Sequence, residues 1–427
     1  MTDSTETPRR ATYTLFVLFA INAMNFFDRV IGGAVAEPIR KEWQLSDSQL
    51  GALGTAFTLL YAFAGVPLGR LADRVSRKRL LAGGVAVWSG LTALSGVART
   101  FWTLFVMRLG VGVGEAVCAP AATSLIGDLY PPARRGRAMS MFMMGLPIGI
   151  ALSFFLGGSI AHTYGWRAAF LVAGAPGLLC AVAAMFIKEP ARDGGRVGES
   201  VAHPYRSVLS IPTMWWIIVS GALHNFNMYA LGSFIAPFAM RYHGANLKQA
   251  GLISMTVYGL SGIPGLLAGG VLADAIGRKR KDGRLLLGAV CILISVPLMV
   301  LALMQPPRAI TAFVVLATSG CMVMYVYYST VYAAIQDVVE PRLRGTAMAL
   351  YFLAMYVLGA SLGPLGTGMA SDFFTKRAAA AAGAAVLEPF KGAGLHNAMY
   401  LIPMLSIILT FVLFAASKTI VRDARQQ

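Results

Sequence analysis

Apolar stretches of membrane-spanning length recur along the whole chain, and they constrain the fold more than any other feature of the sequence. A transmembrane helix needs about 20 consecutive, mostly apolar residues. Stretches of this kind lie at 11–34, 48–69, 80–98, 103–128, 137–161, 166–187, 213–240, 248–273, 285–304, 310–336, 345–371 and 396–417. They are too long and too uniformly apolar for barrel strands. The sequence therefore predicts an all-α membrane protein with twelve transmembrane helices.

Charge is scarce in this chain and unevenly distributed. Charged residues make up 13% of the sequence, against about 25% in soluble domains. The net charge of +17 invites a nucleic-acid interpretation, but Lys and Arg are concentrated in alternate loops. This pattern predicts that both termini lie in the cytoplasm. It also indicates that the positive charge faces anionic lipid head groups rather than nucleic acid.

The cysteines provide neither a disulfide framework nor the spacing of metal ligands. All of them fall inside predicted spans, at Cys118, Cys180, Cys291 and Cys321. The polar start of the chain and the long first span give no cleavable targeting segment. We therefore expect a multi-pass protein of a bacterial inner membrane. We also expect a monomer without a metal or cofactor.

Two motifs occur twice, at equivalent places in the two halves of the chain. GRLADRVSRKR at 69–79 matches GVLADAIGRKR at 270–280, and DLYPPARRGRAM at 128–139 matches DVVEPRLRGTAM at 337–348. A set of six spans with its loops is therefore repeated, which predicts two pseudo-symmetric six-helix bundles with a transport site near the bilayer midplane. The predicted parts are an N-terminal bundle at 1–187, a polar cytoplasmic linker at 188–212 and a C-terminal bundle at 213–427.

GRLADRVSRKR resembles the signature of the major facilitator superfamily between the second and third spans, and the resemblance covers the whole chain. It implies the major facilitator fold, whose two halves alternate access to a central site. It also implies a cytoplasmic gate of charge networks, formed here by Asp73, Arg77, Asp128, Arg135, Asp274, Arg278, Asp337 and Arg344. One departure is Ser76, where the family usually has glycine. We expect slight strain there, because serine accepts a positive φ less readily than glycine.

Four charged residues lie well inside predicted spans, where each costs at least about 2.5–3.5 kcal/mol. Asp28 and Arg29 belong to the first span, and Arg108 and Glu115 belong to the fourth. At about 1.5 Å per residue, Arg108 reaches the height of Asp28 and Arg29, whereas Glu115 lies nearer the midplane. Adjacent helix residues point about 100° apart, so we predict two crosswise pairs, Asp28 with Arg108 and Arg29 with Glu115.

Three further segments refine the family resemblance. NFFDRV (25–30), RLGVGVGEA (108–116) and GWRAAF (165–170) together are similar to the spinster branch of the superfamily, which includes bacterial members. That resemblance implies transport of lysophospholipids or sphingoid lipids such as sphingosine 1-phosphate. Organic-anion and sugar-acid symporters of the superfamily carry similar motifs. A proton-coupled carrier of small soluble anions therefore stays as the alternative.

The buried charges suggest how transport is coupled to a proton gradient. Arg29 or Arg108 would bind an anionic head group through charge-assisted hydrogen bonds. Glu115 or Asp28 would then lose its partner and take up a proton, which removes a buried charge. Further candidates for substrate binding are Asn25, His224, Asn225, Tyr325 and Tyr328. We expect no enzyme, since the sequence shows neither a nucleophile with its base nor a metal cluster.

Overall fold

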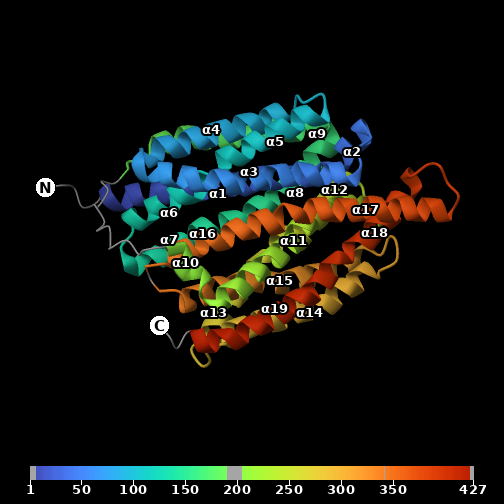
Figure 1. The fold of residues 1–427 in the computed structure, drawn as a ribbon. Helices are drawn as coiled ribbons and strands as arrows, with labels where there is room; N and C mark the ends of the chain where they lie inside the picture. Colours follow the sequence, from blue (N-terminus) through green and yellow to red (C-terminus); the bar gives the residue numbers. More distant parts are fainter. Residues whose placement is uncertain (1–5, 190–203, 341, 424–427) are drawn as a thin grey trace. The chain divides into compact units, whose positions relative to one another are not determined.

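The computed structural model describes residues 6–189, 204–340 and 342–423, apart from the side chains of residues 6–9, 66, 69, 70, 72–74, 132, 133 and 136. In these described ranges every element of regular secondary structure is a helix (Figure 1). The all-α prediction is therefore confirmed for this part of the chain. Most of the predicted linker, and the side chain of the predicted gate residue Asp73, lie outside the described residues.

Most predicted spans are single helices in the described ranges. These are α1 (Glu6–Ala34), α3 (Asp47–Arg74), α4 (Arg77–Ser95), α9 (Trp166–Met185), α11 (Pro212–Arg241), α14 (Gly283–Leu303) and α15 (Ile310–Val338). Three short elements, α2 (Ala36–Trp43), α10 (Pro204–Leu209) and η3 (Glu388–Phe390), lie between predicted spans.

The remaining predicted spans are divided into shorter helices. They are α5 (Phe101–Glu115) with α6 (Cys118–Leu129), α7 (Pro132–Met143) with α8 (Gly145–Tyr164), and α18 (Lys391–Met399) with α19 (Leu401–Asp423). Two more contain a π-helical turn: α12 (Leu247–Ser254), η1 (Met255–Leu260) and α13 (Gly262–Gly277), and α16 (Arg344–Ala354), η2 (Met355–Ala360) and α17 (Leu362–Ala381).

Each π-helical turn has a local cause in the sequence. Pro264 and Pro364 follow η1 and η2 by four residues. A proline lacks the N–H of an α-helical bond, and its ring crowds the carbonyl four residues earlier, which is the last carbonyl of each π-turn. Serine hydroxyls bond back to the widened turns, from Ser261 to the Val257 oxygen at 2.6 Å and from Ser361 to the Tyr356 oxygen at 2.7 Å.

Nine helical segments of the described residues are long and apolar enough to cross a membrane. The helices α3, α4 and α11, of 28, 19 and 30 residues, coincide with the other predicted spans but lie outside that set. The count of twelve spans stays a prediction, as does the cytoplasmic location of both termini.

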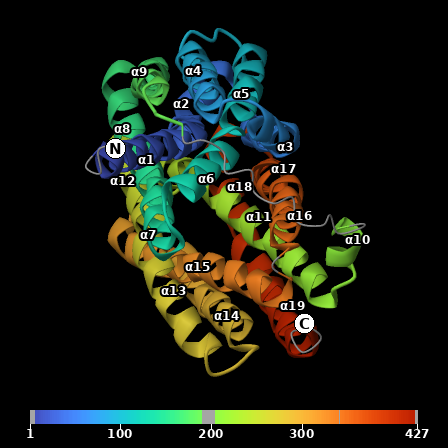
Figure 2. The same ribbon diagram turned by 90° about the vertical axis from the view of Figure 1, so that its left-hand side faces the viewer.

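The chain divides into two compact units. Unit 1 comprises Met1–Leu45, Ala56–Arg196 and Leu247–Met255, and unit 2 comprises Ser46–Thr55, Val197–Asn246 and Thr256–Gln427. Within unit 1, α1 packs against α8 and α9, and α4 packs against α5 and α9. Within unit 2, α14 packs against α15 and α19, and α11 packs against α19 (Figure 2).

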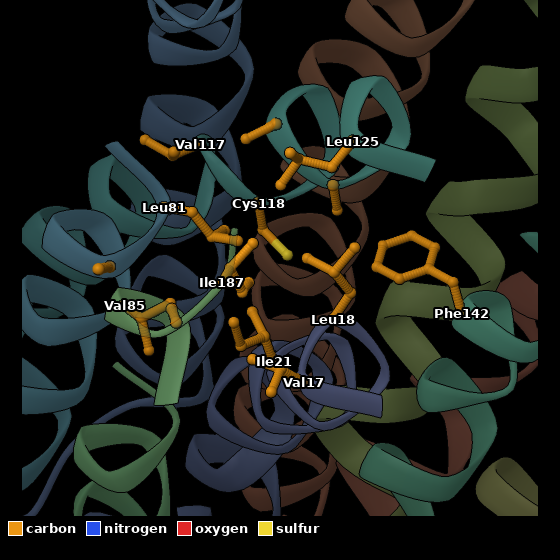
Figure 3. Packing of buried hydrophobic residues seen from close by; sticks show 14 of the residues in the cluster. Val17, Leu18, Ile21, Leu81, Val85, Val117, Cys118, Leu125, Phe142 and Ile187 are labelled. Carbon is orange, nitrogen blue, oxygen red and sulfur yellow. The ribbon is translucent and has the colours of Figure 1, made fainter. Parts of the chain in front are cut away.

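The core of unit 1 is built from apolar side chains of several helices. Figure 3 shows Val17, Leu18 and Ile21 of α1 lying close to Leu81 of α4 and to Cys118, which begins α6. Apolar burial alone gives little preference for one helix partner in a membrane, because lipid tails are equally apolar. Close packing of this kind, aided by small residues, is what holds such helices together.

Candidate transport site

The predicted pair of Arg29 and Glu115 is present inside unit 1. Arg29 lies on α1 and Glu115 ends α5, and their side chains are 3% and 0% exposed. Arg29 donates to Glu115 Oε2 from Nη2 at 3.1 Å and from Nε at 3.3 Å. It also donates to Asn25 Oδ1, one helical turn away, at 3.1 Å. One half of the crosswise prediction is therefore confirmed.

Aromatic rings enclose the Arg29 guanidinium. Its central carbon lies 4.5 Å from the ring centroid of Tyr61, 4.7 Å from that of Phe26 and 5.3 Å from that of Phe57. Cations are attracted to aromatic faces, and the attraction strengthens when water is excluded. The rings therefore help to hold the Arg29 charge inside the unit.

The second predicted pair, Asp28 with Arg108, is wrong. Arg108 donates instead to backbone oxygens of α1, from Nη1 to that of Asp28 at 2.9 Å and from Nη2 to that of Arg29 at 3.1 Å. The height estimate for Arg108 was sound, but its guanidinium reaches α1 at the backbone. A helix carbonyl keeps a lone pair free for such a donor, which sequence spacing does not reveal.

Asp28 is fully buried, and neither carboxylate oxygen has a hydrogen-bond partner among the described residues. Its charged neighbours in the other helices are Arg108 and Glu115. Two arginines and two acids thus share the interior of unit 1, so their charges cancel when all four are ionised. Adding or removing one proton or one anionic group would break that balance.

The glycines of α5 explain how these charges come so close to other helices. A Cβ atom at Gly112 would lie 2.5 Å from the Phe57 carbonyl oxygen of α3, and one at Gly114 would lie 2.9 Å from the Trp88 Cβ of α4. Both distances are too short for a side chain. The RLGVGVGEA segment therefore serves helix packing, which fixes the position of Glu115.

The candidates of the second half lie together in unit 2. Tyr328 donates to Asn225 Oδ1 at 3.0 Å, and Tyr325 donates to the backbone oxygen of Tyr258 at 2.7 Å. His224 is fully buried and stacks on Tyr327, with ring centroids 3.9 Å apart. Tyr327 was not among the predicted binding residues. Its position beside Tyr328 offered a signal, because His224 contacts both rings.

One predicted gate cluster of unit 1 is present around Arg77. Arg77 donates to Asp128 and to Ser124, and its Nε donates to Glu189 Oε1 at 2.9 Å. Ser76 donates to Glu189 Oε2 at 2.6 Å. Burial opposes ionisation of Glu189, but the hydrogen bonds from Ser76 and Arg77 outweigh it and lower the pKa of Glu189 to about 2. Glu189 was not predicted.

The expected strain at Ser76 is wrong. Ser76 has φ −61° and ψ 118°, and its hydroxyl accepts a hydrogen bond from the Arg79 amide at the start of α4. This is the ordinary N-cap role of serine. The serine therefore suits the turn in which the family usually has glycine.

The corresponding cluster of unit 2 uses a different arginine. Arg284 donates to Asp337 and lies 3.4 Å from Asp274, where the sequence predicted Arg278. Arg77 and Asp128 are 51 residues apart, and Arg284 and Asp337 are 53 apart. The turn before α14 is longer than the turn before α4, so the basic residue that reaches the acids comes later in the sequence. Matching the two motifs position by position did not take this difference into account.

Arg135 and Arg344 occupy equivalent positions in the two units. Each guanidinium donates to a backbone oxygen eight residues earlier, Arg135 to Gly127 at 2.7 Å and Arg344 to Gln336 at 2.8 Å. These oxygens lie in the last turns of α6 and α15, which leave carbonyls without helical partners. Both arginines thus bind helix ends rather than the neighbouring acids.

The GWRAAF segment has a partner at the other end of unit 1. Glu42, next to the end of α2, accepts hydrogen bonds from Trp166 Nε1 and from both terminal nitrogens of Arg167, each at 2.7 Å. The bonds from Arg167 lower the pKa of Glu42. This contact fastens the start of α9 to α2.

Another buried ion pair lies in unit 2 and was not predicted. Arg241 Nη1 donates to Asp47 Oδ2 at 2.8 Å, and Ser371 donates to the same oxygen at 2.6 Å. Asp372 accepts from the Ser48 backbone amide at 2.9 Å. Both acids lie at ends of predicted spans, where a charge is ordinary and gives no signal in the sequence.

Comparisons with known proteins identify the family of this chain. Residues 16–364 match the family model of the Major Facilitator Superfamily. An MFS-type efflux pump of Mycolicibacterium smegmatis is 30% identical over 86% of each chain. Protein spinster homolog 1 of Xenopus tropicalis is 28% identical over 86% of this chain and 74% of its own. A probable L-galactonate transporter of Escherichia coli is 25% identical over 86% and 85%.

A solved structure extends the comparison to three dimensions. The crystal structure of a bacterial homologue of the human lysosomal transporter spinster, inward-facing and unoccupied, has a TM-score of 0.88 and 27% identity. The match covers 97% of this chain and 98% of that one. The chain belongs to the major facilitator superfamily of membrane transporters. Within this superfamily, the chain is a spinster-like transporter. The segments NFFDRV, RLGVGVGEA and GWRAAF predicted this branch.

Proposed function

We propose that this transporter carries an anionic or zwitterionic amphiphile, such as a lysophospholipid, and that proton movement drives the transport. The protein would lie in a bacterial inner membrane, with twelve spans and both termini in the cytoplasm. It would function as a monomer. No cofactor is required, because the proton gradient supplies the energy. The resemblance to the spinster branch, through the lipids that it implies, supports the amphiphilic substrate, and the buried charges of unit 1 support the coupling.

The observation that best supports this proposal is that the two buried arginines have different kinds of hydrogen-bond partner. Arg29 is bound to a carboxylate, whereas both hydrogen bonds of Arg108 go to neutral carbonyl oxygens. A phosphate offers the charge-assisted bonds that Arg108 lacks. We therefore assign Arg108 as the main ligand of the head group. Arg29 and Asn25 would contact the head group next, after Arg108 has bound it.

Coupling follows from charge balance. An anionic head group at Arg108 adds a negative charge to an interior that is neutral when all four charged residues are ionised. A proton on Glu115 or Asp28 restores neutrality, and this lowers the cost of moving the loaded site away from water. The gate clusters around Arg77 and Arg284 would then open and close at the predicted cytoplasmic end.

The aromatic candidates of unit 2 have a different proposed role. His224, Asn225, Tyr325 and Tyr328 satisfy one another or the backbone, apart from the ring nitrogens of His224. We propose that they supply apolar aromatic surface for an acyl chain rather than charge recognition.

A proton-coupled carrier of small soluble organic anions is the second candidate. The L-galactonate transporter relative supports it, because that protein is named for a sugar acid and matches 86% of this chain. The same arginines would bind a carboxylate as readily as a phosphate.

Uptake into proteoliposomes separates the two candidates. Radiolabelled lysophosphatidylethanolamine and galactonate are offered under an inward proton gradient to the intact protein and to Arg108→Gln. Arg99→Gln is the matched control, since Arg99 is exposed in the turn before α5. We expect lysolipid uptake that Arg108→Gln abolishes and Arg99→Gln leaves intact. Uptake of galactonate alone would move the protein to the organic-anion carriers.

A further inference from the structure

Within the part of the chain that the structure describes, polar atoms without hydrogen-bond partners gather around Asp28 inside unit 1. They are both carboxylate oxygens of Asp28, Nε1 of Trp88, Oγ of Ser89 and Oγ1 of Thr92. All four residues are fully buried. Buried polar side-chain atoms nearly always have a partner. Such a concentration at one place, around an acid, points to a bound group that serves several of them at once.

The placement of these residues shows that they belong together. Trp88, Ser89 and Thr92 lie within four residues on α4, and a helix brings positions four apart onto one face. Trp88 and Thr92 interact with the Asp28 carboxylate, although neither has hydrogen-bonding geometry to it. A Cβ at Gly177 of α9 would lie 2.0 Å from Ser89 Oγ and 4.0 Å from Asp28 Oδ2.

The glycine of α9 therefore lets the Ser89 hydroxyl lie against the α9 backbone, on the side that faces Asp28. By the triangle rule, the two oxygens are at most about 6 Å apart, a separation that one small molecule can bridge with two hydrogen bonds. The site lies between α1, α4 and α9, which pack against one another.

The chemistry of the donors selects the bound group. The indole N–H of Trp88 only donates, so it cannot ligate a cation. Arg108 already places a positive charge near Asp28, so a metal ion would be repelled. Water fits, because it accepts from Trp88, donates to Asp28 and can exchange hydrogen bonds with both hydroxyls.

We propose that a water molecule bound between α1, α4 and α9 links Asp28 to Trp88, Ser89 and Thr92, and that these three are positioning residues for the proton of Asp28. The proposal deepens the proposed function and rests on it for its role in transport. Other charged or titratable groups facing Asp28 are Arg108 and Glu115 of α5 and Cys180 of α9. Arg29 follows it on α1.

The water and its three neighbours act on the two forms of Asp28 differently. Ionised Asp28 accepts hydrogen bonds from the water, which the Trp88 N–H polarises. Protonated Asp28 donates its own proton to the water and needs no further donor. Removing a donor from α4 therefore favours the protonated form.

Infrared titration of the purified protein without substrate tests the proposal directly. The carboxyl C=O band of Asp28 is assigned as the band lost in Asp28→Asn. Its pH midpoint is then compared among the intact protein, Trp88→Phe, Ser89→Ala and Thr92→Val. We expect each variant to raise the midpoint by about one pH unit, a tenfold gain in proton affinity.

Ser153→Ala is the matched control. Ser153 is equally buried, and its hydroxyl donates to the Phe27 backbone oxygen at 2.7 Å rather than to the site. In Ser153→Ala, the pH midpoint of the Asp28 carboxyl band should stay unchanged. An unchanged midpoint in all the α4 variants that fold would refute the positioning role. A midpoint that depends on sodium would overturn the water assignment in favour of a cation. Because no substrate is present, either result is independent of whether lysolipid is transported.

Discussion

The buried pair of Arg29 and Glu115 can be taken apart one charge at a time. Both side chains are under 10% exposed, and a single carboxylate oxygen accepts both hydrogen bonds. Removing one partner leaves the other charge uncompensated, which typically costs about 3–5 kcal/mol. We therefore expect Glu115→Leu and Arg29→Met each to lower the free energy of unfolding by about that amount.

The double variant separates the pair from its surroundings. Replacing both charges by apolar residues of similar size is often neutral or stabilising, so Arg29→Met with Glu115→Leu should be more stable than either single variant. The expected coupling energy in the cycle reaches about 3 kcal/mol, the upper end for residues in contact. Glu115→Gln keeps an acceptor oxygen and should cost about 1–2 kcal/mol, the loss of charge assistance alone.

Unfolding in mixed detergent micelles, followed by tryptophan fluorescence, measures these values. The exposed pair of Arg280 and Asp282 is the control, at 2.8 Å with the arginine 60% exposed. A pair of that kind contributes at most about 1 kcal/mol. A coupling energy for Arg29 and Glu115 no larger than that of the control would refute the claim that their charges depend on each other.

Further predictions concern packing and the predicted gates. The pKa of Glu189 is lowered to about 2 in the folded protein, so ionised Glu189 should stabilise unit 1 fully above its unfolded pKa of about 4.3. This stabilisation should disappear as the pH falls towards 2. A Glu189→Gln variant should lack that pH dependence in thermal unfolding. Gly112→Ala should cost about 1–3 kcal/mol, because its Cβ would meet a backbone oxygen of α3, whereas Gly127→Ala, with open space around it, should not destabilise. Asp47→Ala should destabilise unit 2 by about 3–5 kcal/mol in denaturant unfolding, since it leaves Arg241 buried without its carboxylate; a loss below about 1 kcal/mol would mean that the pair is solvated.

Much of the fold could be predicted because hydrophobic length is a strong signal. The predicted spans coincide with helices across the described ranges, and the two π-helical turns come just before Pro264 and Pro364. The family could be predicted because a loop signature occurs twice. Sequence does not reveal how the chain groups in space, since Ser46–Thr55 belongs to unit 2 while the rest of α3 belongs to unit 1.

The charged site was predictable only in part. A charge within a span must find a partner, so Arg29 and Glu115 could be matched by the directions of their side chains, although their estimated heights differ. Arg108 could not, because every helix residue offers a backbone oxygen and none stands out in the sequence. Ser89 and Thr92 were missed because uncharged polar residues are common in spans. Only their position beside the buried Asp28, which the sequence does not show, marks them as part of a site.

The central claim is that protons move with an amphiphile through the charged interior of unit 1. The most direct test is the change in pH inside proteoliposomes, read by a trapped dye, when a lysophospholipid is added to the intact protein and to Glu115→Gln. The account predicts a substrate-triggered pH change with intact protein and its loss in the variant, while lysolipid binding persists. Lysolipid transport without any pH change in the intact protein, or an undiminished pH change in Glu115→Gln, would contradict it.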